Sequence, residues 1–186
     1  MNLPIALASN SPRRLQLLEG AGFIVTRISS EGDEDFPEDM PLAEVAPFLA
    51  CKKMERVEEQ ELITLTADTT VVFPDEILNK PGSAEEAVRM LKKLSGRSHK
   101  VVTGVCMRNP AGQIVSFSDT TEVWFRELDE ALINYYLKHG NPYDKAGGYG
   151  IQESIGYLGI EKVNGCFYNV MGLPLRLVYE NYLKLL

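Results

Sequence analysis

The sequence predicts an α/β fold built on a mixed sheet. Short β-prone runs alternate with amphipathic helical segments along most of the 186 residues, as in folds where helices pack on a sheet. Two longer β-prone runs, at 101–107 and 114–125, flank the turn sequence Asn109–Gly112 and predict an inserted hairpin. Strand–helix alternation favours parallel pairing, whereas a hairpin is antiparallel, so the sheet is expected to be mixed.

The first half of the chain begins with a strand–turn–helix unit. Ser11 is a good N-cap, and Pro12 suits the first helical position because its missing N–H would have had no partner there. The following helix is expected to bury Val45, Phe48, Leu49 and Met54. The elements expected here are, in order, a strand at 3–8, a helix from Pro12, a strand at 23–28, an acidic loop at 30–41, a helix at about 41–59 and a strand at 62–73.

The second half opens with a clear helix signal. Ser83 and Glu86 form a capping box, and Gly96 ends that helix. The later elements are the hairpin, a helix at about 129–139, a glycine-rich loop at 141–152, a strand at 157–163 and a helix at about 174–186. Since the chain shows no internal repeat and no linker, residues 1–186 are expected to form a single domain.

The composition excludes several function classes. The formal charge of −7 makes the molecule as a whole repel nucleic acid and anionic membranes. The cysteines, Cys51, Cys106 and Cys166, lack zinc-site spacing and suit a reducing compartment. No segment approaches the roughly 20 apolar residues of a membrane-spanning helix. A cytoplasmic protein that binds neither nucleic acid nor membrane is therefore expected.

The segment Ser9–Arg14 is a candidate phosphate site. It opens the first helix, where free backbone N–H groups and the helix dipole favour an anion. It also adds two hydroxyls and two guanidinium groups, and Arg matches phosphate oxygens in a bidentate fork. The alternative is a well-capped surface helix with solvated arginines.

Asp68 is a candidate catalytic residue because it lies inside a strongly β-prone run. A carboxylate there is costly to bury unless it is paired or used in chemistry. Asp68 would serve as a general base or as a Mg²⁺ ligand. The alternative is that it lies at a strand end and accepts hydrogen bonds from backbone N–H groups.

Three further features are candidates for ligand binding. Lys80, in a Pro/Gly turn, would reach a phosphate or remain a solvated turn residue. Lys53, on a mostly apolar helix face, would extend to solvent or point into a site. The glycine-rich segment 144–152 permits close approach to a ligand, and its Gln152 can donate to and accept from a base edge.

These residues belong to a longer ordered set of short motifs. In that set the chain resembles the Maf family of nucleotide pyrophosphatases over nearly its whole length. The motifs are Leu7–Arg14, Asp33–Glu34, Leu49–Ala50 with Lys53, Ala67–Thr69, Lys80–Pro81, Leu94–Gly96, Val102–Val105, Asp144–Gly147, Gly150–Gln152 and Asn169–Pro174. One departure is Asn79, which stands where the family commonly has Gly before the Lys-Pro pair.

The resemblance implies a fold, an activity and a cofactor. The fold would be an elongated mixed α/β structure similar to inosine triphosphate pyrophosphatases, with two lobes around a central cleft. The activity would be hydrolysis of dTTP and UTP, or of modified pyrimidine nucleotides, to the monophosphate and pyrophosphate. A divalent cation, Mg²⁺ or Mn²⁺, and a homodimer are also expected.

The resemblance also implies roles for individual residues. Asp68 falls on the catalytic proton acceptor and is expected to share the metal with Glu34. The residues that match the dTTP and UTP branch are Arg13, Thr69 and Gln152. The residues expected to neutralise the triphosphate are Ser9, Arg13, Arg14, Lys53 and Lys80.

A non-catalytic alternative is a nucleotide-sensing regulator of cell division and septum formation. Asp68 and Glu34 favour the enzyme, because a pure triphosphate binder gains nothing from carboxylates beside phosphates.

Overall fold

The structure, a computed structural model, describes residues 3–29 and 35–186. Its strands are β1 (Leu3–Ala8), β2 (Phe23–Ile28), β3 (Thr64–Val72), β4 (Ile77–Leu78), β5 (Ser98–Arg108), β6 (Ile114–Phe125) and β7 (Ile160–Asn164). Its helices are α1 (Pro12–Gly20), α2 (Leu42–Glu55), α3 (Ala84–Leu94), α4 (Glu130–His139), a 3-10 turn η1 (Ala146–Gly148), α5 (Ser154–Gly159), α6 (Phe167–Val170) and α7 (Leu175–Leu185).

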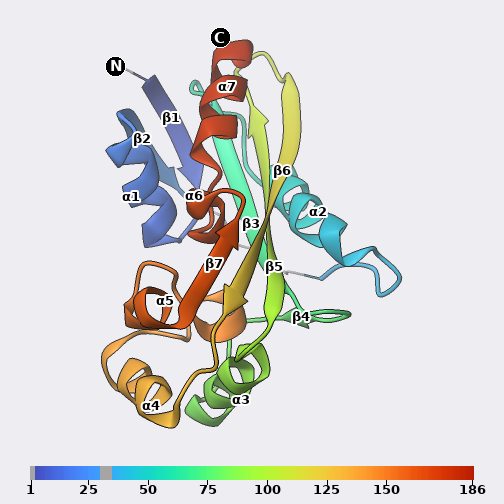
Figure 1. Cartoon of the computed structure of the whole chain (residues 1–186). Coiled ribbons are helices and arrows are strands. Elements are labelled where there is room, and N and C mark those ends of the chain that lie inside the picture. Colours follow the sequence, from blue (N-terminus) through green and yellow to red (C-terminus); the bar gives the residue numbers. More distant parts are fainter. Residues whose placement is uncertain (1–2, 30–34) are drawn as a thin grey trace. The chain divides into compact units, whose positions relative to one another are not determined.

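The strands of the described part form one mixed sheet, which confirms the predicted fold class. Its order is β2-β1-β3-β5-β6-β7, and the short β4 pairs with β3 (Figure 1). β1 runs parallel to both β2 and β3, whereas β4 is antiparallel to β3 and β7 is antiparallel to β6. The predicted β5–β6 hairpin is closed by hydrogen bonds between Asn109 and the residues of its turn.

The chain divides into two compact units. The first comprises Met1–Thr69, Thr103–Asp119 and Gly172–Leu186, and the second comprises Thr70–Val102 and Thr120–Met171. Strands β3, β5 and β6 contribute residues to both units. Within the described residues, no helix combines the length and the apolar character needed to cross a bilayer.

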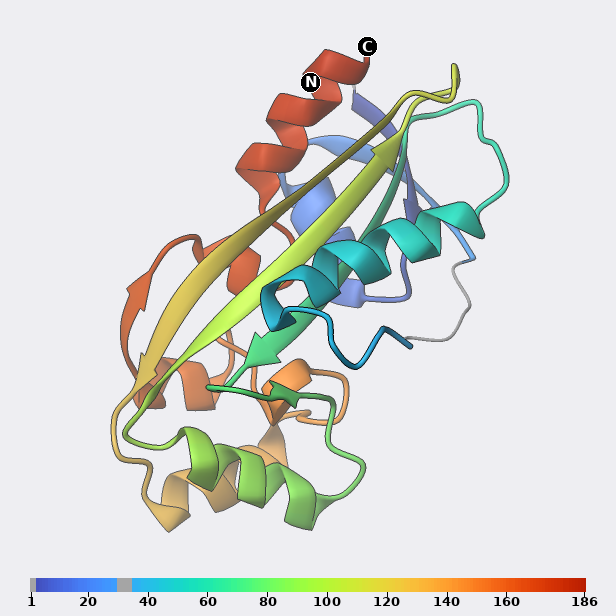
Figure 2. The ribbon, with the colours of Figure 1, turned by 90° about the vertical axis from the view of Figure 1, so that its right-hand side faces the viewer.

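In the first unit, α2 lies across one face of the sheet (Figure 2). Its buried residues are Val45, Ala46, Leu49, Ala50 and Met54. The prediction that Phe48 is buried is wrong, since 37% of this residue is exposed. The helix rests on the sheet through Ala46 and Ala50. Phe48 lies two positions from each of them, so its side chain is turned about 200° around the helix axis from the side that meets the sheet.

In the second unit, α3 has the predicted N-terminal cap. The Ser83 hydroxyl accepts from the Glu86 N–H at 3.2 Å, and the Glu86 carboxylate accepts from the Gly82 N–H at 2.7 Å. The strand expected at 157–163 begins only at Ile160, because 154–159 form α5. That short helix depends on a close approach, since a Cβ at Gly156 would lie 2.1 Å from the Ile151 carbonyl oxygen.

The second unit also buries a histidine. His99 is 3% exposed, its Nε2 lies 2.6 Å from the Tyr149 hydroxyl, and its ring stacks on Phe125. Burial lowers the pKa of His99 to about 3. The unfolded chain, with an ordinary histidine pKa of about 6.5, therefore takes up a proton over a range where the folded protein stays neutral.

We expect this histidine to make the protein less stable in mild acid. The contribution of neutral His99 to the free energy of unfolding is complete above about pH 6.5. It is lost as the pH falls toward 3, at up to about 1.4 kcal/mol per pH unit. Urea unfolding at pH 7 and pH 5 measures how far the free energy of unfolding falls between the two pH values. The fall should be smaller in His99→Gln than in the wild type. The exposed His139→Gln is the matched control, and equal losses in wild type and His99→Gln would contradict the assignment.

Candidate active site

Strand β3 carries the candidate catalytic carboxylate. Asp68 is the fifth of nine residues in β3, and its side chain is 11% exposed. It forms an ion pair with the Lys53 ammonium of α2, whose side chain is 15% exposed. The pair explains how a carboxylate is tolerated inside a buried strand, because an isolated charge there would be strongly destabilising. A strand-end position for Asp68 is excluded, and Lys53 points inward.

The contact between α2 and the sheet holds this pair in place. The Thr66 hydroxyl donates to the carbonyl oxygen of Ala50 at 2.7 Å and is fully buried. Thr66 and Asp68 are two residues apart in β3, so their side chains project from the same face of the strand. Lys53 lies in the last turn of α2, less than one turn beyond Ala50. The hydrogen bond of Thr66 thus fixes the helix beside the carboxylate that Lys53 meets.

Arg14 ties together three segments that are far apart in the sequence. Its guanidinium donates to the carbonyl oxygens of Gly172 at 2.9 Å and Ala67 at 2.8 Å. It also donates to the hydroxyls of Ser9 and Thr69, both at 3.1 Å. The sequence predicted that Arg14 neutralises the triphosphate, whereas these four bonds direct most of its donors to protein acceptors. The side chain therefore positions Ser9 and Thr69.

We expect Arg14→Lys to destabilise the protein by about 2–4 kcal/mol, because a lysine has a single ammonium and leaves buried carbonyl oxygens without donors. The midpoint of urea unfolding measures the change. Arg176→Lys on α7 is the matched control, since the Arg176 side chain is 71% exposed, and it should shift stability by less than about 0.5 kcal/mol. An Arg14→Lys midpoint equal to that of the control would exclude the tying role.

The turn after β1 retains features of an anion site. Ser9 is 5% exposed, and Ser11 occupies the N-cap of α1 without a side-chain capping hydrogen bond among the described residues. The expected capping by the Ser11 hydroxyl is therefore not seen. No acidic side chain lies in the first turn of α1, on which Arg13 is half-buried. The positive end of this helix remains suited to an anion.

Thr103 and Gly172 lie next to Thr69, which Arg14 holds. Thr69 and Thr103 place their hydroxyl oxygens 3.0 Å apart, and Thr103 is fully buried in β5. A Cβ at Gly172, which has φ +105°, would lie 3.4 Å from the Thr69 hydroxyl. Sequence reasoning assigned no role to Thr103 or Gly172, although both lie in motifs that carry the resemblance.

The other predicted site residues belong to the second unit or fall outside the described residues. Lys80 is exposed and Gln152 is half-buried, and both belong to the second unit. The side-chain oxygen of Gln152 is buried and has no hydrogen-bond partner among the described residues. Glu34 lies outside the described residues. Residues 3–29 and 35–186 contain no group of three or more His, Cys, Asp or Glu side chains that could hold a metal ion.

The glycine-rich loop of the second unit is organised by a buried lysine. Lys145 is 5% exposed, and its ammonium bonds the Asn141 carbonyl oxygen at 2.6 Å, Asp144 at 2.7 Å and Glu153 at 2.8 Å. Glu153 also accepts from the Tyr136 hydroxyl at 2.6 Å. Since an ammonium has three donors, Lys145 is saturated by protein acceptors and holds the loop rather than a phosphate.

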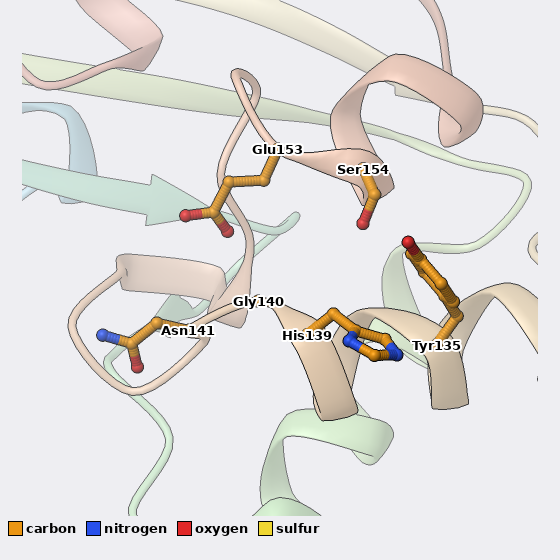
Figure 3. Close-up of a pocket in the computed structure, with 6 residues that line it drawn as sticks. All are labelled: Tyr135, His139, Gly140, Asn141, Glu153 and Ser154. Atoms are coloured by element: carbon orange, nitrogen blue, oxygen red, sulfur yellow. The ribbon is translucent and has the colours of Figure 1, made fainter.

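A pocket of about 430 Å³ opens beside this loop (Figure 3). Its lining comes from the C-terminal part of α4 and the segments that follow, and comprises Tyr135, His139, Gly140, Asn141, Glu153 and Ser154. The lining holds a carboxylate and no lysine or arginine. Because Lys145 already pairs with Glu153 and the lining adds no other cationic side chain for a triphosphate, this pocket does not suit the substrate expected from the sequence.

Comparison with known proteins shows the family and the fold to which the chain is similar. The profile of a family described as Maf-like protein matches residues 4–185. A dTTP/UTP pyrophosphatase from Parabacteroides distasonis is 46% identical over 95% of this chain and 93% of its own length. One of the same name from Cytophaga hutchinsonii is 44% identical over 99% of this chain and 85% of its own. A HAM1 protein from Coxiella burnetii shares the fold at a TM-score of 0.51, covering 96% of this chain and 99% of that one at 14% identity.

Proposed function

Because the chain belongs to the Maf-like protein family, we propose that it is a nucleoside triphosphate pyrophosphatase that hydrolyses dTTP and UTP to the monophosphate and pyrophosphate. The observation that carries this proposal is the buried ion pair of Asp68 and Lys53. Relatives named dTTP/UTP pyrophosphatase match at least 95% of the chain that carries this ion pair. A carboxylate can act as a general base that accepts a proton from an attacking water.

The proposed reaction is attack of water on the α-phosphorus. Asp68 accepts a proton from the water, a bond forms between the water oxygen and phosphorus, and the bond from the α-phosphorus to the bridging oxygen breaks. Pyrophosphate leaves with the β- and γ-phosphates. Lys53 stabilises the charged carboxylate before the reaction and gives positive charge to the site.

Further residues would neutralise the triphosphate. Ser9 and Arg13, at the start of α1, would offer a hydroxyl, a guanidinium and the positive end of the helix. Lys80 would add a point charge. Arg14 would act mainly through its hold on Ser9 and Thr69.

The proposed cofactor is Mg²⁺ or Mn²⁺, held by Asp68 and Glu34. Asp68 fits this role because carboxylate oxygens are the ligands that such hard cations prefer, and its carboxylate is not sealed from solvent. When bound, the cation would neutralise phosphate charge and favour ionisation of a water.

We also propose that residues 1–186 work as one domain and as a homodimer in the cytoplasm. Three strands shared by both compact units support a single domain. Three free cysteines suit a reducing compartment. The charge of −7 disfavours nucleic acid and anionic membranes as partners.

The test is pyrophosphate release with Mg²⁺ from dTTP, UTP, CTP, ATP and GTP. Release from dTTP and UTP above the others is the expected result. Preference for another base would support the pyrophosphatase activity but contradict the proposed specificity for dTTP and UTP. No release from any nucleotide, by folded and metal-loaded protein, would favour the regulator that senses nucleotides without cleaving them.

Gln152 is proposed to read the base, together with Arg13 and Thr69. The amide can accept from the N3–H and donate to the 4-carbonyl of uracil or thymine, and its oxygen is buried and has no partner among the described residues. Gln152→Glu removes the donor and should lower kcat/KM for UTP relative to CTP by about 10-fold or more. Gln113→Glu, in the exposed hairpin turn, should leave that ratio unchanged. Equal ratios in both variants would exclude Gln152 from base selection.

A further inference from the structure

Two of the three cysteines meet in the first unit. Cys51 of α2 and Cys106 of β5 are hydrogen-bonded through their thiols. With Ala50 and Met54 they form a small apolar cluster between the helix and the sheet. Cys106 is 1% exposed, whereas Cys51 is half-buried and within reach of small solutes. Cys166 belongs to the second unit.

The backbone on both sides of this pair is held by one side chain. The Thr66 hydroxyl donates to the carbonyl oxygen of Ala50 at 2.7 Å and lies 3.4 Å from that of Cys106. Ala50 directly precedes Cys51, so the same hydroxyl bridges the segments that carry the two sulfur atoms. The two segments are therefore held side by side while both cysteines remain free thiols.

The surroundings shift the pKa values of the two thiols in opposite directions. Hydrogen bonds with the Cys106 thiol and with the Ser116 hydroxyl, whose oxygen lies 3.2 Å from the Cys51 sulfur, lower the pKa of Cys51 to about 6. The contact with Cys51 and burial raise the pKa of Cys106. Near neutral pH, Cys51 is thus the nucleophile and Cys106 the protonated neighbour.

We propose that Cys51 and Cys106 are a modification site at which a hydroperoxide forms a reversible intramolecular disulfide. The Cys51 thiolate attacks the terminal peroxide oxygen, the O–O bond breaks, and Cys51 becomes a sulfenic acid while hydroxide or an alkoxide leaves and takes a proton from water. The Cys106 sulfur then attacks the Cys51 sulfur, the S–O bond breaks, and water leaves with the thiol proton. Two thiols lose two electrons in total and the peroxide gains them.

The position of the site gives the disulfide a route to the candidate active site. Forming an S–S bond of about 2.05 Å draws the two sulfurs together from hydrogen-bond contact. Cys51 is two residues from Lys53 on α2, whose ammonium meets Asp68. We expect the oxidised protein to release pyrophosphate several-fold more slowly, an effect that rests on the proposed function.

The test uses the full-length protein, reduced, freed of reductant and treated with hydrogen peroxide. The remaining thiols are alkylated under denaturing conditions with N-ethylmaleimide and counted by intact mass. The expected product carries one alkyl group, on Cys166, and a peptide linked from Cys51 to Cys106 that dithiothreitol separates. Cys166→Ser is the matched control and should form the same link.

Variants separate the two steps. In Cys106→Ser, and in Cys106→Ala, which keeps the cluster apolar, oxidation should stop at a Cys51 sulfenic acid that dimedone captures. Three alkylated thiols in the treated wild type, or a link that includes Cys166, would overturn the proposal. The mass measurement does not depend on nucleotide hydrolysis, so the disulfide and the proposed function can fail separately. A linked protein with unchanged pyrophosphate release would overturn only the effect on turnover.

Discussion

Asp68→Asn is expected to lower kcat for dTTP and UTP by about a thousand-fold, because the amide cannot accept the proton of the attacking water. Nucleotide binding should remain measurable, since the side chain keeps its size and the groups proposed to bind phosphate remain in place. Pyrophosphate release measures the turnover, and calorimetry with a non-hydrolysable analogue measures binding. Near-normal turnover would remove Asp68 from the mechanism.

Stability must be measured in the same variant. Asp68→Asn leaves the Lys53 ammonium without its carboxylate partner at 15% exposure, which should cost about 2–3 kcal/mol. Turnover is therefore compared at a temperature where urea unfolding shows the variant to be folded. Asp75→Asn, an exposed aspartate, is the matched control and should change neither turnover nor stability.

Gly104→Ala is expected to have the largest effect on stability, a loss of about 3 kcal/mol or more. A Cβ at Gly104 would lie 2.2 Å from both the Cα and the nitrogen of Pro47 in α2. These are backbone atoms, so the helix itself must move away from β5 to admit the methyl group. Because α2 also carries Lys53, turnover should fall together with stability. Urea unfolding and pyrophosphate release measure the two effects.

Gly20→Ala is the control for this prediction. Gly20 is the last residue of α1, and a Cβ there meets no other atom within 4 Å. Alanine restricts the unfolded chain and favours the helix, so the variant should be unchanged or more stable by up to about 1 kcal/mol. If Gly104→Ala behaved like Gly20→Ala, the close packing of α2 on β5 would be wrong.

Local signals predicted most of the secondary structure. The β-prone runs at 3–8, 23–28 and 114–125 became strands with the expected bounds, and Ser83 caps α3 as its motif indicated. The misplacements arose where local signals were weak. The Ser154–Gly159 segment contains β-prone residues and no capping side chain, yet it is helical because Gly156 allows close packing on Ile151. Phe48 was misplaced because a helix that is apolar on several sides does not reveal which side meets the sheet.

The sequence by itself determined the fold class and the family, and it predicted the candidate site residues, because propensity, capping and motif order are read over a few neighbouring residues. Only the tertiary structure decided what those side chains touch. Arg14 meets carbonyl oxygens 53 and 158 residues away, and Lys53 meets Asp68 across the contact between a helix and a strand. Such partners are selected by packing and by the need to satisfy buried polar groups, which act between segments that the chain order keeps apart.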